Sequence, residues 1–191
     1  MTQPTYFVTD VETNGPTPGV HSMISFACIA CRESVGIVDG FEVNLLPLPE
    51  MSEHPEVMAW WRTEPEAYAY VNEDQIDASD AMDQWVAWIE QFPVERVFVA
   101  HPLSFDGAWM DWYLRRFSGR PLFRGPLKGA SLFSDAGLDL PSYAAGKLGI
   151  SPELMDQHAY PDDWMGGVPH SHRAIDDATG YAHLLLRLLT T

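Results

Sequence analysis

The strongest constraint on this chain is a pair of acids, Asp10 and Glu12, that closes the apolar run at residues 6–12. That run has strand character, and residues i and i+2 of a strand project to the same face. Both carboxylates are therefore expected to enter one small volume, where without a partner they would repel each other and take up protons. A bound Mg²⁺ or Mn²⁺ removes that penalty, because both ions prefer carboxylate oxygens. The alternative is that Glu12 simply opens the turn at residues 13–16.

Length and composition predict a single folded domain across residues 1–191. A chain of 191 residues can enclose a full core, and its hydrophobic content of 46% excludes a disordered chain. No apolar stretch approaches the ~20 residues that cross a bilayer, and the N-terminus lacks the basic start and apolar core of a signal peptide. We therefore expect a cytoplasmic protein without membrane association.

The two cysteines, Cys28 and Cys31, have the spacing of a C-x-x-C pair but lie in the apolar run 24–31. Positions three apart on a strand point to opposite faces of the sheet, so the thiols are not expected to meet. A zinc site would also need a second pair of cysteines, which the sequence lacks. The pattern favours two buried structural cysteines over a redox or zinc pair.

The net charge is strongly negative, −16, from 27 acidic and 11 basic residues. This balance argues against a protein that binds long nucleic acid by coating it with Lys and Arg. Five of the 11 bases form a basic cluster within one short stretch: Arg115, Arg116, Arg120, Arg124 and Lys128. Such a cluster is typical of a solvated surface, although it also offers a patch that could hold phosphates. Any polyanionic substrate is expected to be short or held only at its end.

Hydrophobic periodicity predicts an α/β fold built on a mixed sheet. Strand patterns occupy residues 5–12, 23–31 and 35–46, and the short link between the last two indicates an antiparallel meander. The apolar run 97–100 follows a series of helical patterns, which suggests a crossover to a strand parallel to an earlier one. Helices are expected to pack on this sheet.

Three helical patterns precede the strand at residues 97–100. They begin at Pro55, at Thr63 with Pro65, and near Ser79 or Asp80. The first of them carries Trp60 and Trp61, which we interpret as core and cleft wall rather than as a binding platform.

The segment 101–107 leads from that strand into a predicted helix that ends at Phe117, with Ser104 as the expected N-cap. The inward stripe of this helix is Trp109, Met110, Tyr113 and Phe117. Asp106 lies three, four and seven residues before the first members of this stripe and is expected on the same face. An inward acid at the mouth of a strand is either a cap satisfied by backbone donors or a third member of the acidic cluster. Asp111 is expected to face outward and pair with Arg115.

The last predicted helix, from Ala174 onward, offers a fourth acid. Its inward stripe is Asp177, Tyr181, Leu184, Leu185 and Leu188, which leaves Asp176 on the solvated side. His172 lies five residues before Asp177 and cannot share an ideal helical face with it. We therefore expect His172 in the approach loop or the first turn, leaning over the site, with His170 as a competitor for that place.

Three motifs, at residues 7–13, 100–106 and 172–178, occur in an order that spans nearly the whole chain. With them the sequence resembles the DEDDh branch of 3′ to 5′ exonucleases, a ribonuclease H-like group that includes oligoribonuclease, ribonuclease T and polymerase proofreading domains. Pro102 departs from the pattern, because many relatives carry Asn after the His of the second motif. The segment 137–145 is similar to the helix that these enzymes place before the third motif.

The resemblance implies a ribonuclease H-like fold and a 3′ to 5′ exonuclease with a two-metal-ion mechanism that releases 5′ mononucleotides. Two divalent ions, Mg²⁺ or Mn²⁺, would be held by Asp10, Glu12, Asp106 and Asp177. Asp10 would bridge the ions, and His172 would act as the general base on the attacking water. The implied substrates are the 3′ ends of RNA or of short single-stranded oligonucleotides, and a homodimer is plausible by the same resemblance.

Substrate contacts are predicted at two places. The backbone of Thr13, Asn14 and Gly15 could hold the terminal nucleotide. Phe105 or Trp109 could stack on a base, although a core role is favoured for both aromatic side chains.

The stretch 150–171 is rich in Pro, Gly, Asp and His and shows no periodicity. Loops of this length in compact domains tend to be functional or mobile. We expect it to border the active site and to deliver His172, with His158, Trp164 and His170 structural or exposed.

Two other functions fit parts of the sequence. A haloacid-dehalogenase-type phosphatase also begins with a strand that ends in Asp, but it requires a second Asp where Glu12 stands. A nuclease-like fold can also serve as a non-catalytic binding or scaffolding module, against which the presence of all four acids and the His argues. Metal-dependent release of mononucleotides separates the enzyme from both alternatives.

Overall fold

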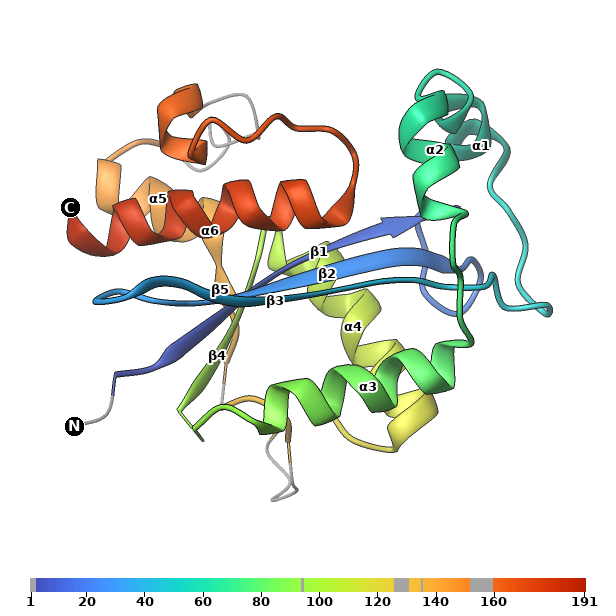
Figure 1. Ribbon diagram of the computed structural model, residues 1–191, viewed down its shortest axis with the longest axis horizontal. Helices are drawn as coiled ribbons and strands as arrows, with labels where there is room; N and C mark the ends of the chain where they lie inside the picture. The colour runs from blue at the N-terminus through green and yellow to red at the C-terminus, as the bar shows by residue number, and fades with distance from the viewer. Residues whose placement is uncertain (1–2, 94, 126–130, 135, 152–159) are drawn as a thin grey trace.

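The computed structural model describes residues 3–93, 95–125, 131–134, 136–151 and 160–191. Its centre is a five-stranded sheet with the strand order β3-β2-β1-β4-β5 (Figure 1). The strands are β1 (Thr5–Thr13), β2 (Met23–Arg32), β3 (Gly36–Asn44), β4 (Arg96–Ala100) and β5 (Leu138–Asp139).

Both parallel and antiparallel pairs occur in this sheet, which confirms the predicted mixed α/β class. β1, β2 and β3 form the expected antiparallel meander. β4 pairs with β1 in the parallel direction, and β5 pairs with β4 in the same way. The chain therefore returns to the far side of β1 after its first three helices, as a crossover requires.

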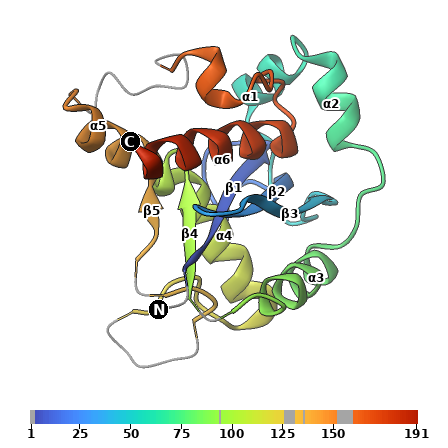
Figure 2. The ribbon, with the colours of Figure 1, turned by 60° about the vertical axis from the view of Figure 1, so that its left-hand side comes forward.

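Helices cover both faces of the sheet (Figures 1 and 2). The helices are α1 (Pro55–Trp61), α2 (Pro65–Val71), α3 (Ala78–Glu90), α4 (Leu103–Ser118), α5 (Leu140–Leu148) and α6 (Ala174–Thr190), with the short 3₁₀ helix η2 (Asp162–Met165). α3 and α4 pack on one face, α5 and α6 on the other, and α1 and α2 lie beyond the carboxyl end of β1. No helix among the described residues is both long and apolar enough to cross a bilayer.

Two hydrophobic cores, one on each face of the sheet, follow from the period of two along the central strands. Phe7 and Val11 of β1 enter the core beneath α3 and α4, whereas Val8 enters the core beneath α6. Cys28 and Cys31 of β2 divide in the same way and are both buried free thiols, which confirms the prediction for them. Burial raises the pKa of each thiol to about 12, so neither is a reactive thiolate at neutral pH.

The start of α4 differs from the prediction. The helix begins at Leu103 and its N-cap position is Pro102, so Ser104 is not the cap. The first backbone N–H of the helix, that of Leu103, donates to Asp139 Oδ1 at 2.9 Å. Asp139 Oδ2 also accepts from the Ser142 backbone N–H at 3.1 Å, so one carboxylate from β5 serves the N-termini of both α4 and α5. The helix predicted at residues 137–145 accordingly starts after a short strand.

Candidate active site

The acids of β1 lie beyond the point where β1 loses its parallel neighbour, β4. Thr9 pairs with Ala100, the last residue of β4, so Asp10 and Glu12 extend past the end of that strand. Asp177, in the first turn of α6, approaches the same point from the face above the sheet. Carboxylate oxygens of Asp10, Glu12 and Asp177 lie within 4.8 Å of one another, close enough to hold one cation. These three residues converge as the strand and helix periods predict.

Asp106 reaches the same end of β1 from α4. The Val11 backbone N–H, which lies past the end of β4, donates to Asp106 Oδ1 at 3.2 Å. Asp106 is 3% exposed, and its other oxygen, Oδ2, is buried without a hydrogen-bond partner among the described residues. Because a buried carboxylate oxygen without a partner is costly, this atom is suited to a bound cation. Backbone donors therefore satisfy only one of the two oxygens of Asp106, which is less than a cap role requires.

The raised pKa values of Asp10, Glu12 and Asp106 also favour a bound cation at this site. Burial and the charges of Asp106, Glu12 and Asp177 raise the pKa of Asp10, and burial with the charges of Asp177 and Asp106 raises the pKa of Glu12. Burial raises the pKa of Asp106 to about 8. Four oxygen donors that repel one another in this way are suited to a hard divalent cation such as Mg²⁺ or Mn²⁺, which would keep them ionised.

The loop before α6 brings two histidines to Asp177. His170 Nδ1 lies 2.9 Å from Asp177 Oδ1, and the Ser171 backbone N–H donates to the same oxygen at 3.3 Å. His172 lies in this approach loop, as expected, with its backbone in the left-handed region at φ 57°. The side chains of His170, His172 and Asp177 present ligand atoms within 4.8 Å of one another. The described part of the stretch 150–171 thus adjoins the acids, while His158 lies outside the described residues.

The two histidines differ in their proton affinity. The hydrogen bond to Asp177 raises the pKa of His170. Burial and the neighbouring His170 lower the pKa of His172. The two environments therefore shift the pKa values of the adjacent histidines in opposite directions. The lowered pKa leaves the His172 imidazole mainly neutral at pH 7 and therefore available to accept a proton.

The adjacent tryptophans divide between the core and the site. Trp61 is 1% exposed, and its Nε1–H donates to the Thr13 carbonyl at 2.9 Å. Trp60 is 38% exposed, and the His172 ring packs against it edge to face with centroids 4.8 Å apart. Trp61 therefore belongs to the core, and Trp60 forms part of the wall beside the site. The contact between Trp60 and His172 joins residues 112 positions apart, which no local pattern could have predicted.

The turn after β1 is tied into the fold by its own polar groups. The Asn14 backbone N–H donates to the Ser22 carbonyl, and the Asn14 carbonyl accepts from His54, both at 2.9 Å. Asn14 Oδ1 accepts from the Ser22 N–H at 2.7 Å. These contacts, with that of the Thr13 carbonyl, give both residues a structural role, and substrate contacts by Thr13 and Asn14 stay predictions. A substrate role for Gly15 stays a prediction.

Gly15 is required by close packing. A Cβ atom at this position would lie 2.3 Å from Cγ of the buried His21 ring. Gly15→Ala is therefore expected to lower the free energy of unfolding by about 1–3 kcal/mol, the usual cost of overpacking. Urea denaturation measures the change. Gly146→Ala is the matched control, because a Cβ in that turn of α5 meets nothing within 4 Å. An equal effect of both substitutions would contradict the packing argument.

The two aromatic candidates for base stacking have different surroundings. Trp109 is fully buried in the core beneath α3 and α4, so the structure gives it the core role and excludes stacking on a base in this conformation. Phe105 packs against the same core but is only partly buried. Stacking by Phe105 stays a prediction.

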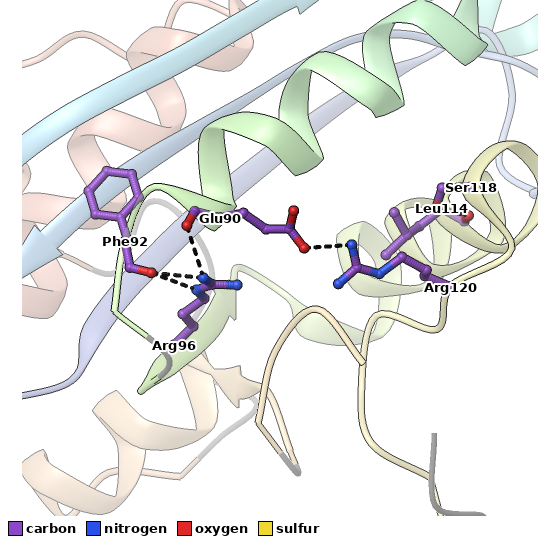
Figure 3. A network of polar contacts seen from close by, with 6 residues as sticks. All are labelled: Glu90, Phe92, Arg96, Leu114, Ser118 and Arg120. Atoms are coloured by element: carbon purple, nitrogen blue, oxygen red, sulfur yellow. Dashed lines mark hydrogen bonds and ion pairs between the residues drawn. The ribbon is translucent and has the colours of Figure 1, made fainter. Parts of the chain in front are cut away.

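Three arginines of the basic cluster form ion pairs with acids outside the candidate site. Arg115 contacts Asp111 at 2.6 Å, as predicted, Arg116 pairs with Glu50, and Arg120 Nη1 lies 2.8 Å from Glu90 Oε1 (Figure 3). Arg116 stands ten residues after Asp106 on α4, about 15 Å along the helix axis. These arginines therefore stabilise the outer surface rather than line the acidic site of their own chain. Lys128 lies outside the described residues.

A pocket opens beside the site, between the segment that contains η2 and the first turns of α6. Its volume is about 420 Å³, and its lining includes Tyr160, His170, Asp177 and Tyr181. The pocket places open space directly against the shared carboxylate Asp177, where a substrate group could approach.

This sheet topology is that of a ribonuclease H-like fold, and comparisons with solved structures confirm the fold. The nuclease domain of 3'hExo, a DEDDh family member solved with rAMP, superimposes with a TM-score of 0.71 at 10% identity, covering 98% of this chain and 92% of that one. Exonuclease I superimposes with a TM-score of 0.64 at 17% identity, covering 98% of this chain and 41% of that one. At these identities the likeness shows the ribonuclease H-like fold alone.

A sequence comparison adds a particular relative, the 3'-5' DNA exonuclease Cap18 of Escherichia coli. It is 32% identical over 114 residues, which are 58% of this chain and 57% of the relative. The chain thus matches just over half the length of this curated relative. No protein-family model matches the sequence.

Proposed function

We propose that this chain is a divalent-metal-dependent 3′ to 5′ exonuclease, a single domain across residues 1–191 that hydrolyses single-stranded ends to 5′ mononucleotides. The observation that carries the proposal is the meeting of Asp10, Glu12 and Asp177 within 4.8 Å, beside the unpartnered oxygen of Asp106. A relative named as a 3'-5' exonuclease supports the reaction class.

The four acids fit a pair of divalent ions. Such ions, when bound, would lower the pKa of the attacking water and stabilise the charge on the leaving 3′ oxygen. Asp10, Glu12, Asp106 and Asp177 would hold them, with Asp10 central because it feels the charges of the other three. Their carboxylates then stay ionised at neutral pH.

His172 is the proposed general base. Its pKa is lowered by burial, so the imidazole is neutral near pH 7 and can accept the proton of the attacking water. The Trp60 ring packs against His172 and limits its rotation, which holds the ring over Asp177. His170, with its raised pKa and its contact to Asp177, is less suited to accept a proton.

The choice between RNA and DNA depends on cleft contacts with the 2′-hydroxyl. The acidic surface, with a net charge of −16, favours short or end-held strands. The resemblance to stand-alone exonucleases favours RNA, whereas the relative at 32% identity is named for DNA. We infer that a single-stranded 3′ end is the shared requirement. A cytoplasmic location and a homodimer stay predictions.

Digestion of matched oligomers tests this function. RNA and DNA of the same sequence, labelled at the 5′ end, are incubated with the protein in Mg²⁺, in Mn²⁺ and in EDTA. The expected result is a ladder that shortens one nucleotide at a time from the 3′ end, in metal only, with 5′ monophosphates released. An oligomer blocked by an inverted 3′-terminal nucleotide is the matched control and should persist. Binding without shortening would instead support the scaffold alternative.

A further inference from the structure

A second group of metal ligands adjoins the four acids, at the loop that enters α6. It consists of His170, His172 and Asp177, whose ligand atoms lie within 4.8 Å of one another. We propose that this group is a binding site for Zn²⁺ or a chemically similar transition-metal ion, which shares Asp177 with the carboxylate site and is inhibitory when filled.

The two groups of ligands differ in chemical character. Asp10 and Glu12 offer oxygen only, the donor set of Mg²⁺ and Mn²⁺. His170 and His172 offer imidazole nitrogen, which suits Zn²⁺, Co²⁺, Ni²⁺ and Cu²⁺ far better than Mg²⁺. Two histidines and one carboxylate also form a ligand set found at zinc sites with one open position. The ion that fills the histidine site is therefore not the ion that fills the carboxylate site.

The histidine site is assembled before any metal arrives. His170 Nδ1 already lies 2.9 Å from Asp177 Oδ1, and the two imidazole rings lie 4.4 Å apart between centroids. Ser171, between the histidines, anchors the loop through its N–H to Asp177 and its hydroxyl to Asp176 Oδ2 at 2.6 Å. The Trp60 ring also packs against His172, edge to face, with centroids 4.8 Å apart. Small movements then suffice for three ligands to reach a common ion, which keeps the ordering cost low.

Asp177 belongs to both groups of ligands. Zinc at the histidine site is therefore expected to inhibit the reaction, an expectation that rests on the proposed function. An imidazole nitrogen that donates its lone pair to Zn²⁺ cannot also accept a proton. Zinc at the histidine site therefore removes His172 as general base and competes for the Asp177 carboxylate. The reaction then stops even though Mg²⁺ is abundant.

Metal binding without nucleic acid tests the site directly. The protein is freed of metal and then saturated with Mg²⁺. Zn²⁺ is titrated into it in competition with a chromophoric chelator. In a parallel titration Co²⁺ replaces Zn²⁺, because the ligand-field absorption of Co²⁺ reports its ligands. We expect one Zn²⁺ bound per chain in the presence of Mg²⁺ and a Co²⁺ spectrum with nitrogen ligands.

His170→Gln removes one imidazole and is expected to weaken Zn²⁺ binding at least about tenfold, the lower end of what even an outer-shell change costs a metal site. His183→Gln is the matched control, because His183 lies on α6 outside the cluster. It should bind Zn²⁺ as the wild type does. Circular dichroism confirms that both variants are folded. Equal Zn²⁺ affinity in His170→Gln and wild type, or Zn²⁺ binding that Mg²⁺ abolishes, overturns the site.

The inhibitory consequence needs a second measurement, on oligomer digestion in Mg²⁺ with increasing Zn²⁺. The expected result is inhibition at the Zn²⁺ concentration that fills the site in the binding titration. Inhibition that does not follow this occupancy overturns the inhibitory role while leaving the site. A protein that binds Zn²⁺ as expected but digests nothing in Mg²⁺ alone refutes the proposed function and not the binding site.

Discussion

Replacing Asp10 with Asn is expected to lower Mg²⁺-dependent 3′ to 5′ hydrolysis about a thousandfold, the loss that follows when a central ligand no longer stabilises the charge of the transition state. Asn keeps the shape of Asp10 but offers one neutral oxygen in place of a carboxylate. The same substitution is expected to raise the free energy of unfolding of the metal-free protein at pH 8. It removes a charge that lies among Glu12, Asp106 and Asp177 and is costly to bury.

A functional carboxylate is distinguished from a structural one because its replacement lowers activity but raises stability. Initial rates on a labelled oligomer give the loss of activity, and urea denaturation in EDTA gives the change in stability. Asp83→Asn is the matched control, since it removes the same charge from the exposed side of α3 and should change neither quantity appreciably. Activity of Asp10→Asn within tenfold of wild type would remove the residue from the site, and a loss of stability would show that its charge supports the fold.

The four acids could be predicted because strand and helix periods act over short distances. A period of two placed Asp10 and Glu12 on one face, and the helical stripes placed Asp106 and Asp177 inward, where both are 3% exposed. The strands themselves follow from apolar runs, and their antiparallel order follows from short links. Each of these inferences uses only neighbours along the chain, which is why the structure confirms them.

The features that escaped prediction depend on partners far away in the sequence. Ser104 looked like a helix cap, but Asp139 accepts the hydrogen bond from the first N–H of the helix, that of Leu103, which lies 36 residues upstream. The arginines of the basic cluster lie at the surface as expected, but two of their partners, Glu50 and Glu90, lie 66 and 30 residues away in the sequence. In the same way, Asp176 was expected to be solvated and is instead half-buried, where it accepts from the Ser171 hydroxyl.

The competition between the two histidines shows the same limit at the site itself. A spacing of five residues excluded an ideal helical face for His172 with Asp177 but could not say which histidine would touch the acid. The left-handed backbone at His172, φ 57°, turns the loop so that His170 makes the contact while His172 meets Trp60. Such a conformation in a non-glycine residue is rarely visible in sequence.

Stability of the metal-free protein is expected to fall as pH rises from about 4 to about 8, and Mg²⁺ should abolish most of that fall. The pKa of Asp106 is about 8 in the folded protein, against 3.8 ordinarily. Between these values the native state holds a proton that the unfolded chain has released, so each rise in pH favours unfolding. The raised pKa values of Asp10, Glu12 and His170 act in the same direction, and the lowered pKa of His172 opposes them near pH 6. Together the effect is on the order of a few kcal/mol.

Urea denaturation in EDTA at intervals from pH 5 to pH 9 measures this fall, and the same series in saturating Mg²⁺ measures its reversal. Bound cations keep the carboxylates ionised in the native state, so native and unfolded chains then hold the same number of protons. Mg²⁺ also adds about 2.7 kcal/mol at a concentration one hundred times its dissociation constant. Asp106→Asn is the discriminating variant, because it keeps the shape of the side chain while removing the group with the pKa of about 8. All other acids are identical in the two proteins and cancel in the comparison. A metal-free wild type whose stability is flat or rises over this range, or a variant with an undiminished slope, would show that the four acids do not share a buried charge.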